Sequence, residues 1–248
     1  MLLFGGNVLA TALFGLLWYA GHFWTGLGLM FAGHMALLSA VLHPRCQWLG
    51  PVHTSIAGRE GEIILTFDDG PDEADTPFIL EQLRQHGRRG IFFVIGEKAR
   101  RHPDLIRRIA AEGHALGNHT LTHPQASCWR LGPGALHREI SACSEILREI
   151  TGNTPAYFRP PVGHKSPFLH PVLRRLGLPL VGWTARGLDG VRTNPAEILR
   201  RLLPRVKPGG IVLMHEGPRT RQGTPLIRET LPAVLAAAAA CEAVKAPA

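Results

Sequence analysis

Residues 63–71 read IILTFDDGP, so two aspartates directly follow a run of apolar residues. The apolar run from Ile63 to Phe67 predicts a buried strand, and a buried strand has no ordinary use for Asp68 and Asp69. Two adjacent carboxylates repel each other and are costly to bury unless other groups compensate their charges. The rest of the chain must therefore supply partners for both aspartates.

Downstream of this stretch, short apolar runs alternate with segments of helical periodicity. The expected strands are residues 63–67, 91–95, 114–117, 156–158, 180–183 and 211–214. The expected helices, which mostly begin near a proline or end near a glycine, are residues 76–86, 103–112, 136–150, 167–176, 195–206 and 225–240. This alternation is typical of parallel strands joined by crossover helices, and about six such units favour an α/β barrel over an open sheet.

Polar residues gather at or just after the carboxyl ends of the expected strands. They are Asp68, Asp69, His119, His123, Arg159, Asp189 and His215. Barrels of alternating strands and helices place their chemistry at this end of the strands. We therefore expect these side chains, although they are distant in the sequence, to meet in one site.

Residues 117–124 read GNHTLTHP and contain two histidines, His119 and His123. If the chain turns helically there, the two imidazoles share one face about 6 Å apart and can bind one divalent cation. Taken alone, the spacing also fits surface or capping histidines, and an Asp after a strand also fits a turn or a helix cap. With Asp69, however, the histidines complete a three-ligand set that leaves positions open for water and substrate, as a catalytic metal site requires.

Residues 1–44 contain no Lys, Arg, Asp or Glu, although the whole chain has a formal net charge of +8. This uncharged segment is long enough for two membrane-spanning helices, because one span needs about 20 apolar residues. We expect spans near residues 3–18 and 26–42, joined by a turn with interfacial aromatic residues. A cleaved signal peptide is the alternative, but such a peptide has a positively charged start and a short apolar core, and this segment has neither.

The expected organisation is a membrane anchor over residues 1–44, a linker over residues 45–61 and a catalytic domain over residues 62–248. We therefore expect a protein of the cell (inner) membrane. Arg45 and Arg59 follow the second expected span and favour a cytoplasmic catalytic domain, but two charges leave the side of the membrane open.

The positive charge of the body suits anionic lipid headgroups as a partner. No zinc-finger, RNP or helix-turn-helix signature accompanies the charge, so we expect no nucleic-acid partner. The four cysteines lack C-x-x-C spacing and indicate neither a disulfide framework nor a structural zinc site. The sequence does not indicate an oligomeric state.

Four segments occur in an order and at intervals that resemble the motifs of the polysaccharide deacetylase family, also known as the NodB-homology or carbohydrate esterase family 4 domain. They read TFDDGPD, GNHTLTHP, FRPPVG and IVLMHEG, and begin at residues 66, 117, 158 and 211. The resemblance runs from about residue 62 to the tail. It implies a deformed (β/α) barrel that hydrolyses N-acyl groups, typically acetyl, from amino sugars with the help of a divalent metal.

The resemblance also implies roles for the residues that match these motifs. Asp68 matches the general base of the family, and Arg159 matches the arginine that pairs with this base. Asp69, His119 and His123 match the three metal ligands. The expected cofactor is one divalent cation, with zinc as the first candidate and cobalt, manganese or nickel as alternatives that suit the same nitrogen and oxygen ligands.

The remaining matches concern proton donation and the acyl group. His215 matches the general acid, and Asp189 matches the aspartate that orients this histidine. Val162 matches the residue that offers a backbone N–H to the oxyanion, and Leu213 matches the residue that lines the pocket for the acyl methyl group. Two departures suggest a more open or more apolar site, because Gly190 stands where the family has a tryptophan and Val162 stands where an aromatic residue is common.

The sequence therefore predicts a membrane-held, metal-dependent N-deacylase whose partner is an amino-sugar glycan or glycolipid. A deformylase or another amidase for small acyl groups is an alternative of the same fold, since Leu213 indicates only that the acyl group is small. A non-catalytic, membrane-anchored glycan-binding module is a second alternative. Such a module would lack the base, a ligand or the acid, and this sequence contains all of them.

Overall fold

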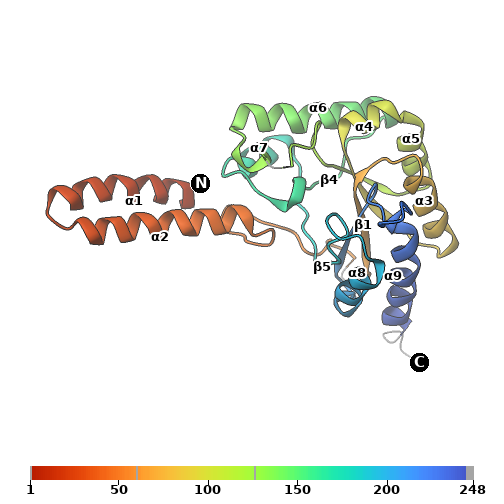
Figure 1. Cartoon of the computed structure of the whole chain (residues 1–248). Helices are drawn as coiled ribbons and strands as arrows, with labels where there is room; N and C mark the ends of the chain where they lie inside the picture. Colours follow the sequence, from red (N-terminus) through yellow and green to blue (C-terminus); the bar gives the residue numbers. More distant parts are fainter. Residues whose placement is uncertain (1, 60, 126, 244–248) are drawn as a thin grey trace.

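Two apolar helices project from one side of an α/β body in the computed structural model of the chain (Figure 1). The structure describes residues 2–59, 61–125 and 127–243. Met1 of the expected anchor, Glu60 of the expected linker, and Ala126 and residues 244–248 of the expected catalytic domain lie outside the described residues.

The projecting helices, α1 (Leu2–Tyr19) and α2 (Phe23–Leu42), pack against each other as an antiparallel hairpin. The turn between them uses Gly21 at φ 79°, a conformation that glycine adopts without strain. At 20 residues α2 is about 30 Å long, which matches the hydrocarbon core of a bilayer. Of the described helices, α2 is the one long and apolar enough to cross a membrane.

Six parallel strands form one sheet among the described residues, in the order β4-β3-β2-β1-β6-β5. They are β1 (Ile64–Gly70), β2 (Gly90–Val94), β3 (Ala115–Asn118), β4 (Tyr157–Phe158), β5 (Ala185–Arg186) and β6 (Ile211–His215). The side chains of β1 alternate between two apolar clusters, with Leu65 and Phe67 in one and Ile64 in the other. Because both faces of the sheet are buried, the strands are apolar runs rather than alternating ones.

Helices cover the outside of the sheet (Figure 1). They are α3 (Asp75–Gln85), α4 (Gly96–Arg101), α5 (Pro103–Ala111), α6 (Pro133–Thr151), α7 (Leu169–Leu176), α8 (Pro195–Leu202) and α9 (Leu226–Ala243), with short 3-10 turns η1 (Cys128–Arg130), η2 (Pro161–Gly163) and η3 (Leu203–Arg205). The expected helix over residues 195–206 ends earlier, at Leu202, and continues as η3 because Pro204 lacks a backbone N–H. The short α4 was not expected, since GEKARR has no apolar periodicity.

The expected strand over residues 180–183 is wrong. Leu180 and Val181 form only single bridges, to Phe158 and His53, and the regular strand β5 starts later, at Ala185. The reason is the buried side chain of Arg159, whose guanidinium donates hydrogen bonds to the carbonyls of Val181 and Gly182 at 3.1 and 2.8 Å. Those two carbonyls are therefore unavailable to a regular strand ladder.

The same irregular segment connects the two edges of the sheet. Val181 N donates to the carbonyl of Phe158, the last residue of the edge strand β4, and the chain then continues to β5 at the opposite edge. The sheet is thus closed by single bridges instead of a continuous ladder. This geometry confirms the expected deformed (β/α) barrel.

The chain that follows α2 lies against the body. Leu49 and Val52 are buried, and His53 bridges to Val181 through two flanking backbone hydrogen bonds: His53 N donates to the Leu180 carbonyl, and Gly182 N donates to the His53 carbonyl. At the end of α2, the buried Lys165 donates from its ammonium to the carbonyls of His43 and Pro44 at 2.6 and 3.0 Å. The end of the apolar hairpin is therefore fixed to the loop that follows η2.

Candidate active site

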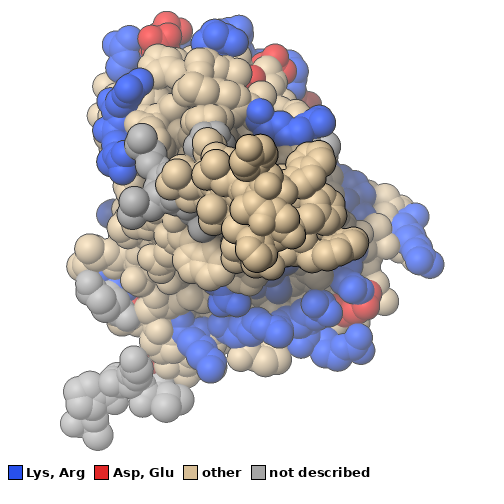
Figure 2. Space-filling view, turned by 90° about the vertical axis from the view of Figure 1, so that its left-hand side faces the viewer, with Lys and Arg blue, Asp and Glu red and all other residues tan. Residues whose placement is uncertain are grey.

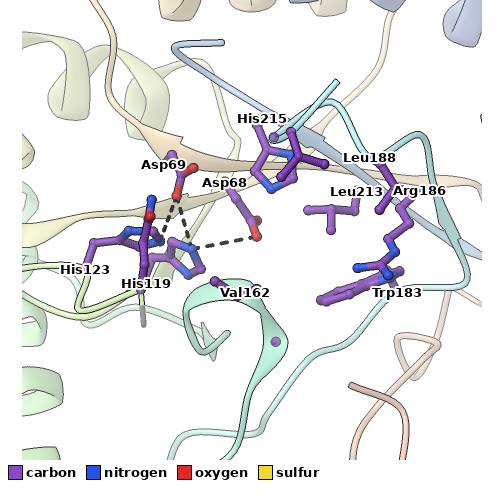
Figure 3. Close-up of a pocket in the computed structure, with 14 residues that line it drawn as sticks. Asp68, Asp69, His119, His123, Val162, Trp183, Arg186, Leu188, Leu213 and His215 are labelled. Atoms are coloured by element: carbon purple, nitrogen blue, oxygen red, sulfur yellow. Dashed lines mark ion pairs between the residues drawn. The ribbon is translucent and has the colours of Figure 1, made fainter. Parts of the chain in front are cut away.

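A cavity of about 160 Å³ opens at the carboxyl ends of β1 and β6 (Figure 3). Seven of the predicted site residues line it, namely Asp68, Asp69, His119, His123, Val162, Leu213 and His215. The other two, Arg159 and Asp189, are buried behind the cavity wall, where they bind Asp68 and His215. The structure thus brings together every side chain that the sequence analysis selected.

Asp69, His119 and His123 form a three-ligand cluster at one side of the cavity (Figure 3). Their donor atoms lie within 4.8 Å of one another, and Asp69 Oδ1 is 3.3 and 3.0 Å from the two imidazole Nε2 atoms. Asp69 Oδ1 is buried without a hydrogen-bond partner in the described part of the chain. A divalent cation among the three residues would satisfy this oxygen, so the donor set fits a metal.

The second nitrogen of His119 supports the same interpretation. Its Nδ1 lies 2.7 Å from the Arg159 carbonyl, and since a carbonyl only accepts, Nδ1 must carry the proton. The Nε2 lone pair then points toward the cavity, as in other metal-binding histidines. Although burial works to raise the pKa of Asp69, the two neighbouring imidazoles hold it well below its usual range, so this ligand is anionic.

The expected helical turn between the two histidines is wrong. Residues 119–123 form an irregular bend with positive φ at Thr120 and His123, and the imidazole centroids are 4.9 Å apart. Asn118 Oδ1 accepts from Thr120 N, and Thr120 Oγ1 accepts from His123 N. Side-chain hydrogen bonds to the backbone therefore shape the bend in place of helical ones.

A bulge in β1 explains how two adjacent aspartates point in different directions. The register with β2 shifts between Asp68 and Gly70, and Asp69 adopts φ 71°. Asp68 consequently turns toward Arg159, which donates to Asp68 Oδ1 at 2.6 Å, while Asp69 faces the histidines. The two charges thus have separate compensating partners, as the sequence analysis required.

His215 ends β6 and is held by Asp189. The imidazole Nδ1 donates to Asp189 Oδ1 at 2.9 Å, and the backbone N–H of His215 donates to Asp189 Oδ2 at 2.8 Å. Burial opposes the imidazolium, but the charge and hydrogen bond of Asp189, together with the charges of Asp68 and Asp69, raise the pKa of His215 to about 9. His215 is therefore a proton donor at neutral pH.

This arrangement predicts how the pH profile responds to Asp189→Asn. The raised pKa keeps His215 protonated up to about pH 9, and removing the Asp189 charge should lower that pKa while burial continues to oppose the charged form. The alkaline limb of kcat against pH should therefore move to lower pH. An unmoved limb would show that a different group titrates there, and Asp104→Asn, which removes an exposed carboxylate on α5, is the control.

Comparison with known proteins identifies the family to which the chain belongs. A family model described as polysaccharide deacetylase matches residues 56–181. The chain belongs to the polysaccharide deacetylase family. The matched residues include Asp68, the cluster of Asp69, His119 and His123, and Arg159. This membership confirms the expected fold and the expected class of enzyme, a hydrolase that acts on N-acetyl amide bonds, while the role of each side chain stays a prediction.

Two curated relatives and one solved structure illustrate the similarity. The chitooligosaccharide deacetylase of Bradyrhizobium sp. (strain ANU 289) is 38% identical over 156 residues, which cover 62% of this chain and 70% of the relative. The peptidoglycan-N-acetylglucosamine deacetylase of Bacillus cereus (strain ATCC 14579) is 34% identical over 159 residues, which cover 64% and 57%. The crystal structure of the Bc1960 peptidoglycan N-acetylglucosamine deacetylase has a TM-score of 0.67 at 28% identity and covers 79% of this chain and 87% of that one.

Both departures from the polysaccharide deacetylase motifs lie at the mouth of the cavity. Val162 is half exposed at φ 59°, and its backbone N–H has no acceptor among the described residues, so it is available to a ligand. Gly190 lies beside the His215 ring, since a Cβ there would be 3.5 Å from that ring. Val191, next in the chain, is exposed and also lines the cavity. Aliphatic side chains thus occupy a rim where the family motifs have aromatic residues.

Among the residues of the cavity wall that were not selected from the sequence are Trp183, Arg186 and Leu188. Trp183, at the end of the strand expected over residues 180–183, is buried, but it also lines the cavity opposite the cluster of Asp69, His119 and His123 (Figure 3). Arg186 and Leu188 line the cavity beside it, with the Arg186 guanidinium 5.5 Å from the centroid of the Trp183 ring. The signal that could have found them is their position between the bridge at Val181 and the orienting Asp189.

Proposed function

We propose that the chain removes the N-acetyl group from an amino sugar in a reaction that requires a divalent cation. The observation that supports this most directly is one small cavity bordered by a carboxylate that Arg159 engages, an open cluster of three candidate metal ligands and a protonated histidine. The matched relatives are a chitooligosaccharide deacetylase and a peptidoglycan-N-acetylglucosamine deacetylase, so their names support an acetylated amino sugar as substrate.

Asp69, His119 and His123 would hold the cation. When bound, the cation supplies Lewis-acid chemistry, which polarises the acyl carbonyl and makes water a better nucleophile at neutral pH. The chain contributes the orientation of these ligands, since the Arg159 carbonyl fixes His119 and the Thr120 hydroxyl accepts from the backbone of His123.

Asp68 and His215 would transfer the protons. The Asp68 Oδ1 atom is engaged by Arg159, which leaves Oδ2 to accept a proton from the attacking water. His215 donates from Nε2 to the departing nitrogen, because its Nδ1 is occupied by Asp189. An amine anion is a poor leaving group, so this protonation is required before the C–N bond breaks. Over the hydrolysis, Asp68 accepts one proton from water and His215 gives one proton to the amine nitrogen, so the number of protons held by the two residues together does not change.

Val162 and Leu213 would select and stabilise the acyl group. The free Val162 N–H can donate to the oxygen of the tetrahedral intermediate, where negative charge develops. The buried Leu213 side chain closes the base of the cavity and leaves room for a small acyl substituent. Incubation with N-acetylated and N-formylated forms of one amino sugar, followed by quantification of acetate and formate, separates the deacetylase from the deformylase alternative.

The α1–α2 hairpin supports a catalytic domain held at a membrane, with residues 1–44 as the anchor and residues 62–248 as the catalytic domain. Its side chains are apolar and exposed along much of both helices, as lipid contact would require. An enzyme held at the bilayer surface has ready access to amino sugars that are attached to lipid. We therefore include a glycolipid among the substrates to be tested.

The cation requirement predicts a specific result for Asp69→Asn. Loss of the anionic ligand should lower the bound metal, measured by plasma mass spectrometry after dialysis, by about tenfold or more, since ligand and supporting residues typically each contribute 10–100-fold to metal affinity. Asp104→Asn, on the surface, should retain the metal. Equal metal content in both variants would contradict the assignment of Asp69 as a ligand, and a wild-type protein that releases no acetate with any divalent cation would contradict the proposed function.

A further inference from the structure

A second groove lies between the end of α2 and the body, with a volume of about 380 Å³. Four arginines line it: Arg45, Arg186, Arg201 and Arg205. They come from separate parts of the chain, namely the segment after α2, strand β5, helix α8 and the turn η3. Figure 2 shows Lys and Arg side chains gathered below the hairpin, on the face of the body from which the hairpin projects.

The positive charge of this groove is not neutralised within the described residues. None of the four arginines has an ion pair with an acidic side chain in that part of the chain, and all four are exposed. Partial burial and the charges of Arg201 and Arg45 lower the pKa of Arg186, so the positive charges of these three arginines of the groove act on one another. Like charges gathered in a concave site raise the local concentration of anions.

The arginine groove adjoins the catalytic cavity and shares part of its wall with it. Trp183, Arg186 and Leu188 line both of them. A ligand that places one group beside His215 can therefore place a neighbouring group among the arginines without leaving the protein surface. The distance between the two groups is short, because one side chain, Arg186, reaches both.

The arginine groove also adjoins the apolar hairpin. Leu42, the last residue of α2, and the two residues after it form one wall of the groove. Lys165 fixes this wall by binding the carbonyls of His43 and Pro44, and Gly163 packs so closely on Pro44 that a Cβ there would lie 3.0 Å from the proline Cβ. The position of the groove relative to the end of the hairpin is therefore built into the fold.

We propose that the arginine groove binds the phosphate group of a lipid-linked, N-acetylated amino sugar. The sugar occupies the catalytic cavity, the phosphate or diphosphate lies among the arginines, and the lipid chain enters the bilayer beside α2. Guanidinium groups suit this role because their planar donors bind phosphate oxygens in pairs. This inference rests on the proposed function, since it names the substrate class of the same site.

The test compares two synthetic glycolipids with the same farnesyl chain and the same N-acetylglucosamine unit, in discs of phosphatidylcholine bilayer. One is joined through a diphosphate and the other through an uncharged glycosidic link. We expect the wild type to favour the diphosphate form in kcat/KM, and Arg201→Gln/Arg205→Gln to lower this preference about tenfold or more. Arg100→Gln/Arg101→Gln, which removes the same charge from exposed positions on α4, should keep it. No preference in the wild type, or the same loss in both double variants, would overturn the proposal.

Bilayer phospholipids are the other source of phosphate, and a second arm separates them. If the arginines bound bulk headgroups, the Arg201→Gln/Arg205→Gln change would weaken binding to phosphatidylglycerol vesicles and leave the substrate preference intact, which also overturns the proposal. Binding of the diphosphate glycolipid is also measured by fluorescence under conditions without turnover. This measurement does not depend on catalysis. Tighter binding by the wild type than by the groove variant, with no acetate released, would refute the proposed function but support the phosphate groove.

Discussion

Replacing Asp68 by Asn is expected to lower kcat for N-acetyl hydrolysis by ~10²- to 10⁴-fold, the range of a lost general acid or base. The amide has nearly the shape of the carboxylate but cannot accept the proton of the attacking water. Asp68 is not among the three cluster residues, so the variant should keep its metal. Loss of turnover without loss of metal is the signature that separates Asp68 from its neighbour Asp69.

The comparison with Asp69→Asn makes this prediction sharp, because the same chemical change is made one residue away. We expect metal content to fall only for Asp69→Asn, and circular dichroism to show that both variants are folded. Equal metal loss in the two variants would contradict the division of roles between the aspartates. A kcat for Asp68→Asn within a few-fold of the wild type would remove Asp68 as the base.

Replacing Arg159 by Met is expected to lower the free energy of unfolding by about 3–5 kcal/mol, as when one partner of a buried ion pair is removed. The Arg159 side chain is fully buried, donates to Asp68 and to the hydroxyl of Thr66, and also takes the carbonyls of Val181 and Gly182. Its loss would leave the Asp68 carboxylate and two carbonyls buried without donors. It would also remove the constraint that shapes the irregular segment before β5.

Urea denaturation followed by far-ultraviolet circular dichroism measures the effect. Arg84→Met is the matched control, because Arg84 forms an exposed ion pair with Glu81 and such pairs contribute little to stability. The double variant Asp68→Leu/Arg159→Met should be more stable than Arg159→Met alone, since it removes the unpaired charge. If Arg159→Met unfolded at the same urea concentration as the wild type, the guanidinium would not be supporting the site.

The sequence was most informative where a motif coincides with the end of a regular element. Asp68 lies near the carboxyl end of β1, His215 ends the neighbouring parallel strand β6, and their Cα atoms pair in register, so the spacing of apolar runs was enough to bring them together. The same reasoning located Asp69, although the β-bulge that turns it away from Asp68 has no signature in the apolar pattern. Strand periodicity identified the edge of the sheet but did not determine side-chain direction.

The parts that could not be predicted depend on interactions between distant segments. The bend at residues 119–123 is shaped by Asn118 and Thr120 side chains, and the strand expected at residues 180–183 is displaced because a distant arginine takes its carbonyls. The position of Trp183 in the cavity wall could not be predicted either, because Trp183 belongs to this displaced segment. The four groove arginines are likewise far apart in the chain, and each alone is typical of a solvated surface.

The contact between Lys165 and the end of α2 limits how the enzyme can be trimmed for work in solution. A version that begins after Pro44 would lose the His43 and Pro44 carbonyls, the two acceptors of a buried ammonium. Burial already lowers the pKa of Lys165 to about 8, and an ammonium without acceptors would disturb the nearby loop that presents the Val162 N–H. A soluble form should therefore either begin before Val41 and keep this short stretch, or exchange Lys165 for an apolar residue. The hairpin can be removed, but its last turn belongs to the catalytic unit.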